Sequence, residues 1–162
     1  MKYLLIITAV ILFIVLVIVI IGFLLPVKHT AHAEVLINVS PESVWQKLTD
    51  FKSYPQWRKN LKSVEAGSAT SWIETDKNNN RLPLEIITED PLKKLTTKIN
   101  GKNLPFGGTW TFTLQKKGNQ TIVTITENGE VYNPVFRFVS RFIMGYSASI
   151  NQYAKDLETA FN

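Results

Sequence analysis

Few residues of this chain could carry out acid–base, nucleophilic or metal chemistry. The chain has 162 residues, no cysteine, and two histidines, His29 and His32. The lack of cysteine excludes disulfides, cysteine-ligated zinc, iron–sulfur clusters and thiol nucleophiles. Both histidines fall where a linker is predicted, so we expect them to take no part in chemistry. The sequence therefore predicts neither a metal site nor a bound cofactor.

Three glutamates remain as candidates for general acid–base catalysis. Glu127 and Glu130 lie on one predicted strand, where a spacing of three places them on opposite faces. A turn or bulge at Asn128-Gly129 would change that arrangement. Glu85 lies on another predicted strand and could face inward alone. No complete catalytic set can be assembled from these residues, so binding is favoured over catalysis while an enzyme stays open.

Aromatic side chains are the stronger candidates for a binding site. Tyr54 and Trp57 each combine an apolar ring with a polar tip, which suits the half-wet rim of a cavity. Trp110 and Phe112 share one face of a predicted strand. The alternative is plain core packing, because a core and a cavity wall have the same sequence pattern. The candidate ligand-binding residues are Tyr54, Trp57, Trp72, Trp110, Phe112, Phe138, Phe142 and Tyr146.

An apolar segment precedes the part of the chain that holds these residues. Residues 3–25 contain no charge, and only Thr8 and Gly22 interrupt the apolar run. A helix of this length spans about 35 Å, enough for a hydrocarbon core of about 30 Å. We predict a membrane anchor at residues 1–26 and a juxtamembrane linker at 27–32.

The alternative to an anchor is a cleaved signal peptide, for which residues 31–33, Ala-His-Ala, form a small-x-small cleavage pattern. The apolar run is much longer than the usual ~7–15 residues of a signal sequence, which favours the anchor. Lys2 precedes the segment together with the amino terminus, and Lys28 alone follows it closely. The positive-inside rule then predicts a single-pass protein with a cytoplasmic N-terminus and an extracytoplasmic domain.

Residues 33–162 show the pattern of one α+β domain. Residues 33–39 alternate as a strand, and Ser40, Pro41 and Glu42 then begin a helix as N-cap, first residue and first-turn acid. A second short helix or turn carries Tyr54 and Trp57. Six further strands separated by tight turns predict an antiparallel meander, at 61–66, 70–77, 82–88, 95–99, 109–115 and 121–131. A long amphipathic helix is predicted from Pro134 to about residue 160, with Gly145 as a weak point.

This order of elements, together with two short motifs, resembles the START-like superfamily, also called SRPBCC, helix-grip or Bet v 1-like. The first motif is Val-Ser-Pro-Glu-Ser-Val-Trp at 39–45, followed by Leu-Thr-Asp-Phe at 48–51 and Tyr-Pro-x-Trp at 54–57. The second is Leu-Pro-Phe-Gly-Gly-Thr-Trp at 104–110. Its bacterial members include the polyketide cyclase/dehydrase and lipid-transport group. The resemblance implies a curved seven-stranded antiparallel sheet wrapped on the long C-terminal helix, with a hydrophobic cavity between them.

The function expected from the sequence is a membrane-anchored domain that binds a hydrophobic, lipid-like or isoprenoid-like molecule. One alternative is a cyclase/dehydrase-like enzyme that acts on a hydrophobic substrate. Another is a structural or interaction module whose groove is filled by its own side chains or by a segment of a partner. The formal net charge of +5 is modest, and no nucleic-acid-binding motif is present. We therefore expect a hydrophobic small molecule or lipid and a membrane as partners, and no nucleic acid.

Overall fold

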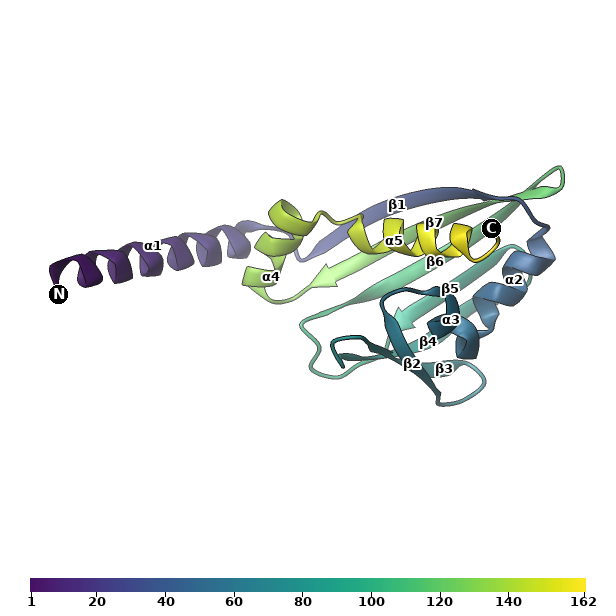
Figure 1. The fold of residues 1–162 in the computed structure, drawn as a ribbon, viewed down its shortest axis with the longest axis horizontal. Coiled ribbons are helices and arrows are strands. Elements are labelled where there is room, and N and C mark those ends of the chain that lie inside the picture. The colour runs from purple at the N-terminus through teal and green to yellow at the C-terminus, as the bar shows by residue number, and fades with distance from the viewer.

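The computed structural model describes residues 1–162 as a helical rod joined to an α+β domain (Figure 1). The rod is α1 (Lys2–Leu24), whose side chains are exposed along most of its length. It is long and apolar enough to cross a membrane. Its N-terminus projects away from the domain, and only its last turns touch another element (Figure 1).

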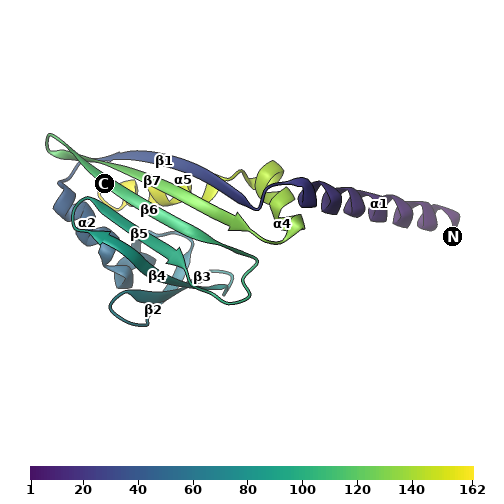
Figure 2. The ribbon, with the colours of Figure 1, turned by 180° about the vertical axis from the view of Figure 1, so that it is seen from behind.

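One sheet of seven strands forms the body of the domain (Figure 2). Every neighbouring pair is antiparallel, in the order β1-β7-β6-β5-β4-β3-β2, which confirms the predicted curved antiparallel sheet. The strands β1, β3 and β7 alternate more and less buried side chains, as a sheet with one covered face requires. They are β1 (Lys28–Ile37), β2 (Leu61–Ala66), β3 (Ser71–Asp76), β4 (Arg81–Asp90), β5 (Lys94–Ile99), β6 (Phe106–Lys117) and β7 (Gln120–Val131).

Helices cover the concave face of this sheet. The helix α2 (Pro41–Thr49) packs Val44 and Leu48 into the core and leads through a 3-10 turn, η1 (Phe51–Ser53), into α3 (Tyr54–Trp57). The C-terminal helix α5 (Ala148–Thr159) lies across the sheet near β1 and β7 (Figures 1 and 2). Its buried side chains include Ile150, Tyr153 and Leu157.

The first strand begins earlier than predicted, which corrects the linker at residues 27–32. Lys28 already pairs with Glu130, and the ladder continues without a break to Ile37 and Thr121. The inward face of β1 runs back from Val35 through two small alanines to His29. The linker prediction failed because polar and small residues at a strand end carry little hydrophobic alternation, whereas pairing with β7 satisfies their backbone groups.

The long C-terminal helix predicted from Pro134 is divided into separate pieces, and this too is a correction. It consists of α4 (Pro134–Val139), a π-helical segment η2 (Ser140–Met144), and α5. Gly145 separates the last two with φ of 79°, a backbone conformation that favours glycine. The break lets α4 and η2 turn toward α1 while α5 stays on the sheet.

Candidate functional site

A cavity of about 590 Å³ lies between the concave face of the sheet and the C-terminal helices. Its walls come from β3 to β7, from α5, and from α4 with η2. Large apolar side chains make up much of the lining, including Leu82, Leu84, Ile99, Trp110, Phe112 and Val131. A purely structural module would have its groove filled by its own side chains. The cavity shows that these side chains leave the groove open.

Five of the eight predicted ligand-binding residues line this cavity, namely Tyr54, Trp72, Trp110, Phe112 and Tyr146. Trp57 does not. Its indole packs edge-on against Tyr54 and Tyr153 at 5.1 and 5.4 Å between ring centroids, as part of the core behind the wall.

Phe138 and Phe142 also lie outside the cavity lining. Their rings pack against each other at 5.0 Å, and the ring of Phe142 is exposed. The helical stripe that placed them beside Tyr146 assumed a continuous helix. The π-helical segment and Gly145 rotate that stripe away from the cavity, and neighbouring residues of the same segment, Val139 and Met144, line it instead.

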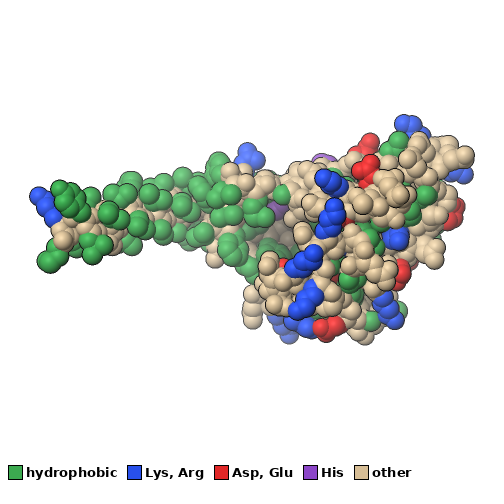
Figure 3. Space-filling view, in the orientation of Figure 1, with side chains coloured by type: hydrophobic (Ala, Val, Ile, Leu, Met, Phe, Trp, Pro, Cys, Tyr) green, Lys and Arg blue, Asp and Glu red, His purple; other side chains and the backbone are tan.

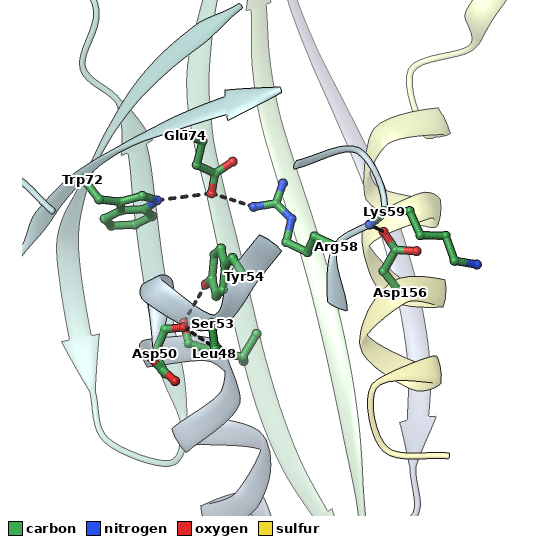
Figure 4. A network of polar contacts seen from close by, with 9 residues as sticks. All are labelled: Leu48, Asp50, Ser53, Tyr54, Arg58, Lys59, Trp72, Glu74 and Asp156. Atoms are coloured by element: carbon green, nitrogen blue, oxygen red, sulfur yellow. Dashed lines mark hydrogen bonds and ion pairs between the residues drawn. The ribbon is translucent and has the colours of Figure 1, made fainter. Parts of the chain in front are cut away.

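A charged pair occupies one wall of the cavity, at the end nearest α3. Arg58 Nη1 donates to Glu74 Oε1 at 2.5 Å, and Trp72 Nε1 donates to the same oxygen at 3.2 Å (Figure 4). The guanidinium also lies over the rings of Tyr54 and Tyr153, 5.2 and 4.8 Å from their centroids. Burial alone would lower the pKa of Arg58, but the adjacent carboxylate of Glu74 raises it, so Arg58 stays charged.

Two further groups on α5 complete this polar end. Asp156 is buried and accepts a hydrogen bond from the Lys59 backbone N–H at 3.0 Å (Figure 4). It also accepts one from Gln152 Nε2 at 2.8 Å. The hydroxyl of Tyr153 is buried in the cavity lining without a protein hydrogen-bond partner. Burial raises the pKa of Tyr153 to about 12, so the hydroxyl is a neutral donor. An unpartnered buried donor facing a cavity is suited to a polar group of a bound molecule.

A second polar cluster lies at the other end, near α4 and η2. His29 Nε2 is 3.7 Å from Glu127 Oε1, and the imidazole stacks on Tyr146 with ring centroids 4.1 Å apart. A Cβ on Gly129 would lie 2.3 Å from His29 Cε1, so only glycine leaves room for the imidazole in this position. The second carboxylate oxygen of Glu127 is buried and has no protein partner.

Burial shifts the pKa values of these two groups toward each other. It lowers the pKa of His29 from its ordinary 6.5 and raises the pKa of Glu127 from its ordinary 4.5. Both groups are thereby biased toward their neutral forms, and the contact at 3.7 Å is not that of a strong ion pair. An acid and a base that share a cavity and both have shifted pKa values are a feature of general acid–base sites.

The other two candidate glutamates do not form a catalytic pair with Glu127. Glu85 lies outside the cavity and accepts a hydrogen bond from Asn100 Nδ2 at 2.8 Å, so its inward orientation was wrong. Glu130 lies at the cavity rim, and its carboxylate accepts from the Tyr132 hydroxyl at 2.7 Å. The strand β7 continues regularly through Asn128 and Gly129 without a turn, so the two carboxylates stay on alternate faces.

The local sequence pattern does not point plainly to several residues of the site. His29 was placed in a linker, although the alternation of the first strand, extended backwards, puts it on the inward face. Glu74 shares a strand face with Trp72, and that spacing of two could have indicated an inward acid. Arg58, Gln152 and Asp156 carry no comparable signal. No three histidine or carboxylate side chains lie together as a metal site would require.

A curved seven-stranded sheet, a cavity and a covering C-terminal helix define a helix-grip protein of the START-like class. The chain belongs to the family described as polyketide cyclase / dehydrase and lipid transport, whose sequence pattern matches residues 28–156. No curated protein matches it significantly.

Solved structures share the fold at low sequence identity. A START superfamily protein from Mycobacterium smegmatis is 16% identical with a TM-score of 0.66, over 82% of this chain and 97% of that one. A conserved protein from Geobacillus kaustophilus is 17% identical with a TM-score of 0.69, over 82% of this chain and 95% of that one. Norcoclaurine synthase from Thalictrum flavum, solved with dopamine and hydroxybenzaldehyde, is 13% identical with a TM-score of 0.64. The match covers 83% of this chain and 86% of that one.

Proposed function

We propose that this protein is a membrane-anchored domain that binds a hydrophobic, lipid-like or isoprenoid-like molecule in the cavity between the sheet and α5. The volume of the cavity carries the proposal, because about 590 Å³ falls within the ~300–1,000 Å³ of small-molecule sites. Burial of the ligand's apolar surface would drive binding, at about 25 cal/mol per Å².

The two polar clusters at the ends of the cavity would orient the ligand. Arg58 and Glu74 neutralise each other, while the hydroxyl of Tyr153 beside them has no protein partner. This combination suits an uncharged polar group, such as a hydroxyl, carbonyl or amide, at one end of a mostly apolar molecule. A free anion would meet the carboxylates of Glu74 and Asp156 as well as the cation.

The anchor in this proposal is α1. Its exposed side chains would place an apolar surface far larger than soluble proteins tolerate into water, whereas a bilayer accommodates it. Anchoring would keep the cavity close to the membrane in which such ligands reside. The charge distribution around the segment supports a cytoplasmic N-terminus and an extracytoplasmic domain.

Native mass spectrometry of the full chain tests the binding proposal. The chain is purified from cells in detergent micelles, released in the spectrometer, and its bound molecules are extracted and weighed. Leu84→Trp places extra volume in the cavity wall, and Ile87→Trp places it on the exposed surface of the same strand. We expect a hydrophobic ligand on the wild type and on Ile87→Trp, and none on Leu84→Trp. Repeated recovery of ligand-free wild type would contradict the proposal.

Membrane orientation is tested separately with Ile87→Cys, since the chain has no other cysteine. A membrane-impermeant maleimide should label this variant in intact cells to the same extent as in lysed cells. Labelling only after lysis would reverse the orientation and leave ligand binding untouched.

The contact between His29 and Glu127 favours a second candidate function, an enzyme that acts on a hydrophobic substrate. In it Glu127 would be the general acid or base and His29 its proton partner, both facing the same cavity. The fold is compatible with either role. Comparing the molecules extracted from wild type and from Glu127→Gln separates the two functions. An enzyme would leave an unconverted substrate of different mass on the variant, whereas a carrier would hold the same molecule in both.

A further inference from the structure

Exposed apolar side chains of the domain gather on one short segment, residues 135–144 of α4 and η2, which we call the apolar tip. Phe142, Ile143 and Met144 are 59%, 70% and 62% exposed, and Phe136 is 46% exposed. Elsewhere on the domain large exposed apolar residues such as Leu36, Ile87 and Leu92 are scattered. Scattered apolar residues are ordinary, but a contiguous patch indicates a surface that contacts something apolar.

The helix α4, which carries the first part of the apolar tip, packs directly on the C-terminal turns of α1. The contact at Gly22 is so close that a Cβ there would lie 2.1 Å from the backbone oxygen of Pro134. Arg137, which is buried, donates from Nη1 to the carbonyl oxygen of Leu25 at 2.8 Å and thereby caps the end of α1. The helix α4 and the end of α1 therefore form one packed unit, and η2 follows α4 directly in the chain.

The position of this contact along α1 sets how deep the tip would lie in a bilayer that α1 crosses. The 23 residues of α1 span about 35 Å, only slightly more than a hydrocarbon core of about 30 Å. The side chains of Ile18, Val19 and Ile21 are partly covered, in contrast to the exposed first four turns, so the domain reaches α1 within the last two turns of the apolar run. An element beside those turns lies at the level of the headgroups and outer acyl chains.

The same segment forms one wall of the cavity. Phe136, Val139 and Met144 line it from the side of the tip, and the surface is hollowed beside the base of α1 (Figure 3). Arg141 projects from this segment with its guanidinium 5.6 Å from the centre of the Tyr146 ring. A long cationic side chain among exposed apolar ones is typical of segments that lie in a membrane interface, where the charge reaches the headgroups.

We infer that the apolar tip is embedded in the bilayer and that the cavity opens beside it, so that its ligand enters laterally from the lipid rather than through water. The inference rests on the proposed anchoring by α1. The occupant of the exposed tip is the hydrocarbon of the bilayer. The apolar composition of the tip, its depth beside α1 and its single exposed arginine all fit that occupant.

Quenching of a fluorophore at single engineered cysteines tests this inference. The full chain, which lacks cysteine, is labelled with an environment-sensitive dye at Ile143→Cys and reconstituted into phosphatidylcholine vesicles. Ile87→Cys, exposed on β4, is the aqueous control, and Leu12→Cys, exposed on α1, is the hydrocarbon control. Doxyl-labelled lipids quench dyes in the bilayer, and iodide quenches dyes in water.

We expect the dye at Ile143 to be quenched strongly by doxyl lipids and weakly by iodide, as at Leu12, and the dye at Ile87 to show the reverse. Iodide quenching at Ile143 as strong as at Ile87, with Leu12 still in lipid, would overturn the inference and leave the anchor intact. Protection of Ile143 from both quenchers would also overturn it, because a protein surface would then cover the tip. Iodide quenching at Leu12 would instead refute the anchor itself.

Discussion

Arg58 and Glu74 form an ion pair inside the wall of a cavity built mostly from apolar side chains. Their side chains are 18% and 6% exposed, and the distance from Arg58 Nη1 to Glu74 Oε1 is 2.5 Å. Each charge has lost most of its hydration, so each depends on the other for compensation. The pair joins the α3–β2 connection to β3 and so closes one end of the cavity.

Removing one partner of this pair should destabilise the protein more than removing both. Glu74→Met leaves a buried unpaired cation, and we expect the free energy of unfolding to fall by about 3 kcal/mol or more. The double variant Arg58→Met/Glu74→Met should recover much of that loss. Urea unfolding of the full chain in micelles, followed by tryptophan fluorescence, measures both effects.

The exposed pair of Arg81 and Glu65 is the matched control, at 2.7 Å with both side chains about half exposed. Arg81→Met should change stability far less than Arg58→Met, because water screens that pair. Equal effects at the two pairs would contradict the view that the cavity wall is desolvated.

Glu127→Gln should stabilise the folded protein at neutral pH. Burial raises the pKa of Glu127 above its ordinary 4.5, so the folded state holds this proton more tightly than the unfolded state. The free energy of unfolding therefore falls as the pH rises from 4.5 through the raised pKa. The variant lacks this fall, so its free energy of unfolding at neutral pH should exceed that of the wild type. The difference should be up to about 1 kcal/mol, because solvent partly screens the group. Urea unfolding of both proteins at pH 4 to 8 measures this difference. The two free energies of unfolding should approach each other toward pH 4.

Gly129→Ala should displace the imidazole of His29 from its stack on Tyr146. The added Cβ would lie within 2.5 Å of the His29 ring, so we expect a loss of about 1–3 kcal/mol from overpacking. The double variant His29→Ala/Gly129→Ala should be more stable than Gly129→Ala, since the space is then free. An imidazole NMR signal unchanged between wild type and Gly129→Ala would disprove the contact.

Gly22→Val should separate the apolar tip from α1 without shortening the apolar run. The added side chain would collide with the backbone of Pro134, whereas Ala9→Val adds bulk on an exposed part of the same helix. Spin labels at Leu12→Cys and Ile143→Cys report the distance between α1 and the tip in vesicles. We expect a longer or broader distance distribution with Gly22→Val and no change with Ala9→Val.

Local patterns in the sequence were enough to predict the class of fold. Alternation along seven segments, tight turns between them, and the helix start at Ser40 and Pro41 are properties of neighbouring residues, so they can be read without tertiary contacts. The apolar run at residues 3–25 was equally plain, because helix length and composition alone decide whether a segment can span a bilayer. Of the five predicted residues that line the cavity, Trp72, Trp110 and Phe112 were assigned to strands, Tyr146 to the helical stripe, and Tyr54 was chosen for the polar tip of its ring.

Tertiary structure decided what lies in the cavity and how the chain ends are arranged. His29 became a cavity residue because β1 pairs with β7 from Lys28 onward and because Gly129 leaves room for its ring. Arg58 and Glu74 meet across the gap between two elements, a relation that neither local stretch encodes. Phe138 and Phe142 lie outside the cavity because the π-helical segment and Gly145 interrupt the helix and because α4 packs on α1, a contact between residues more than a hundred positions apart.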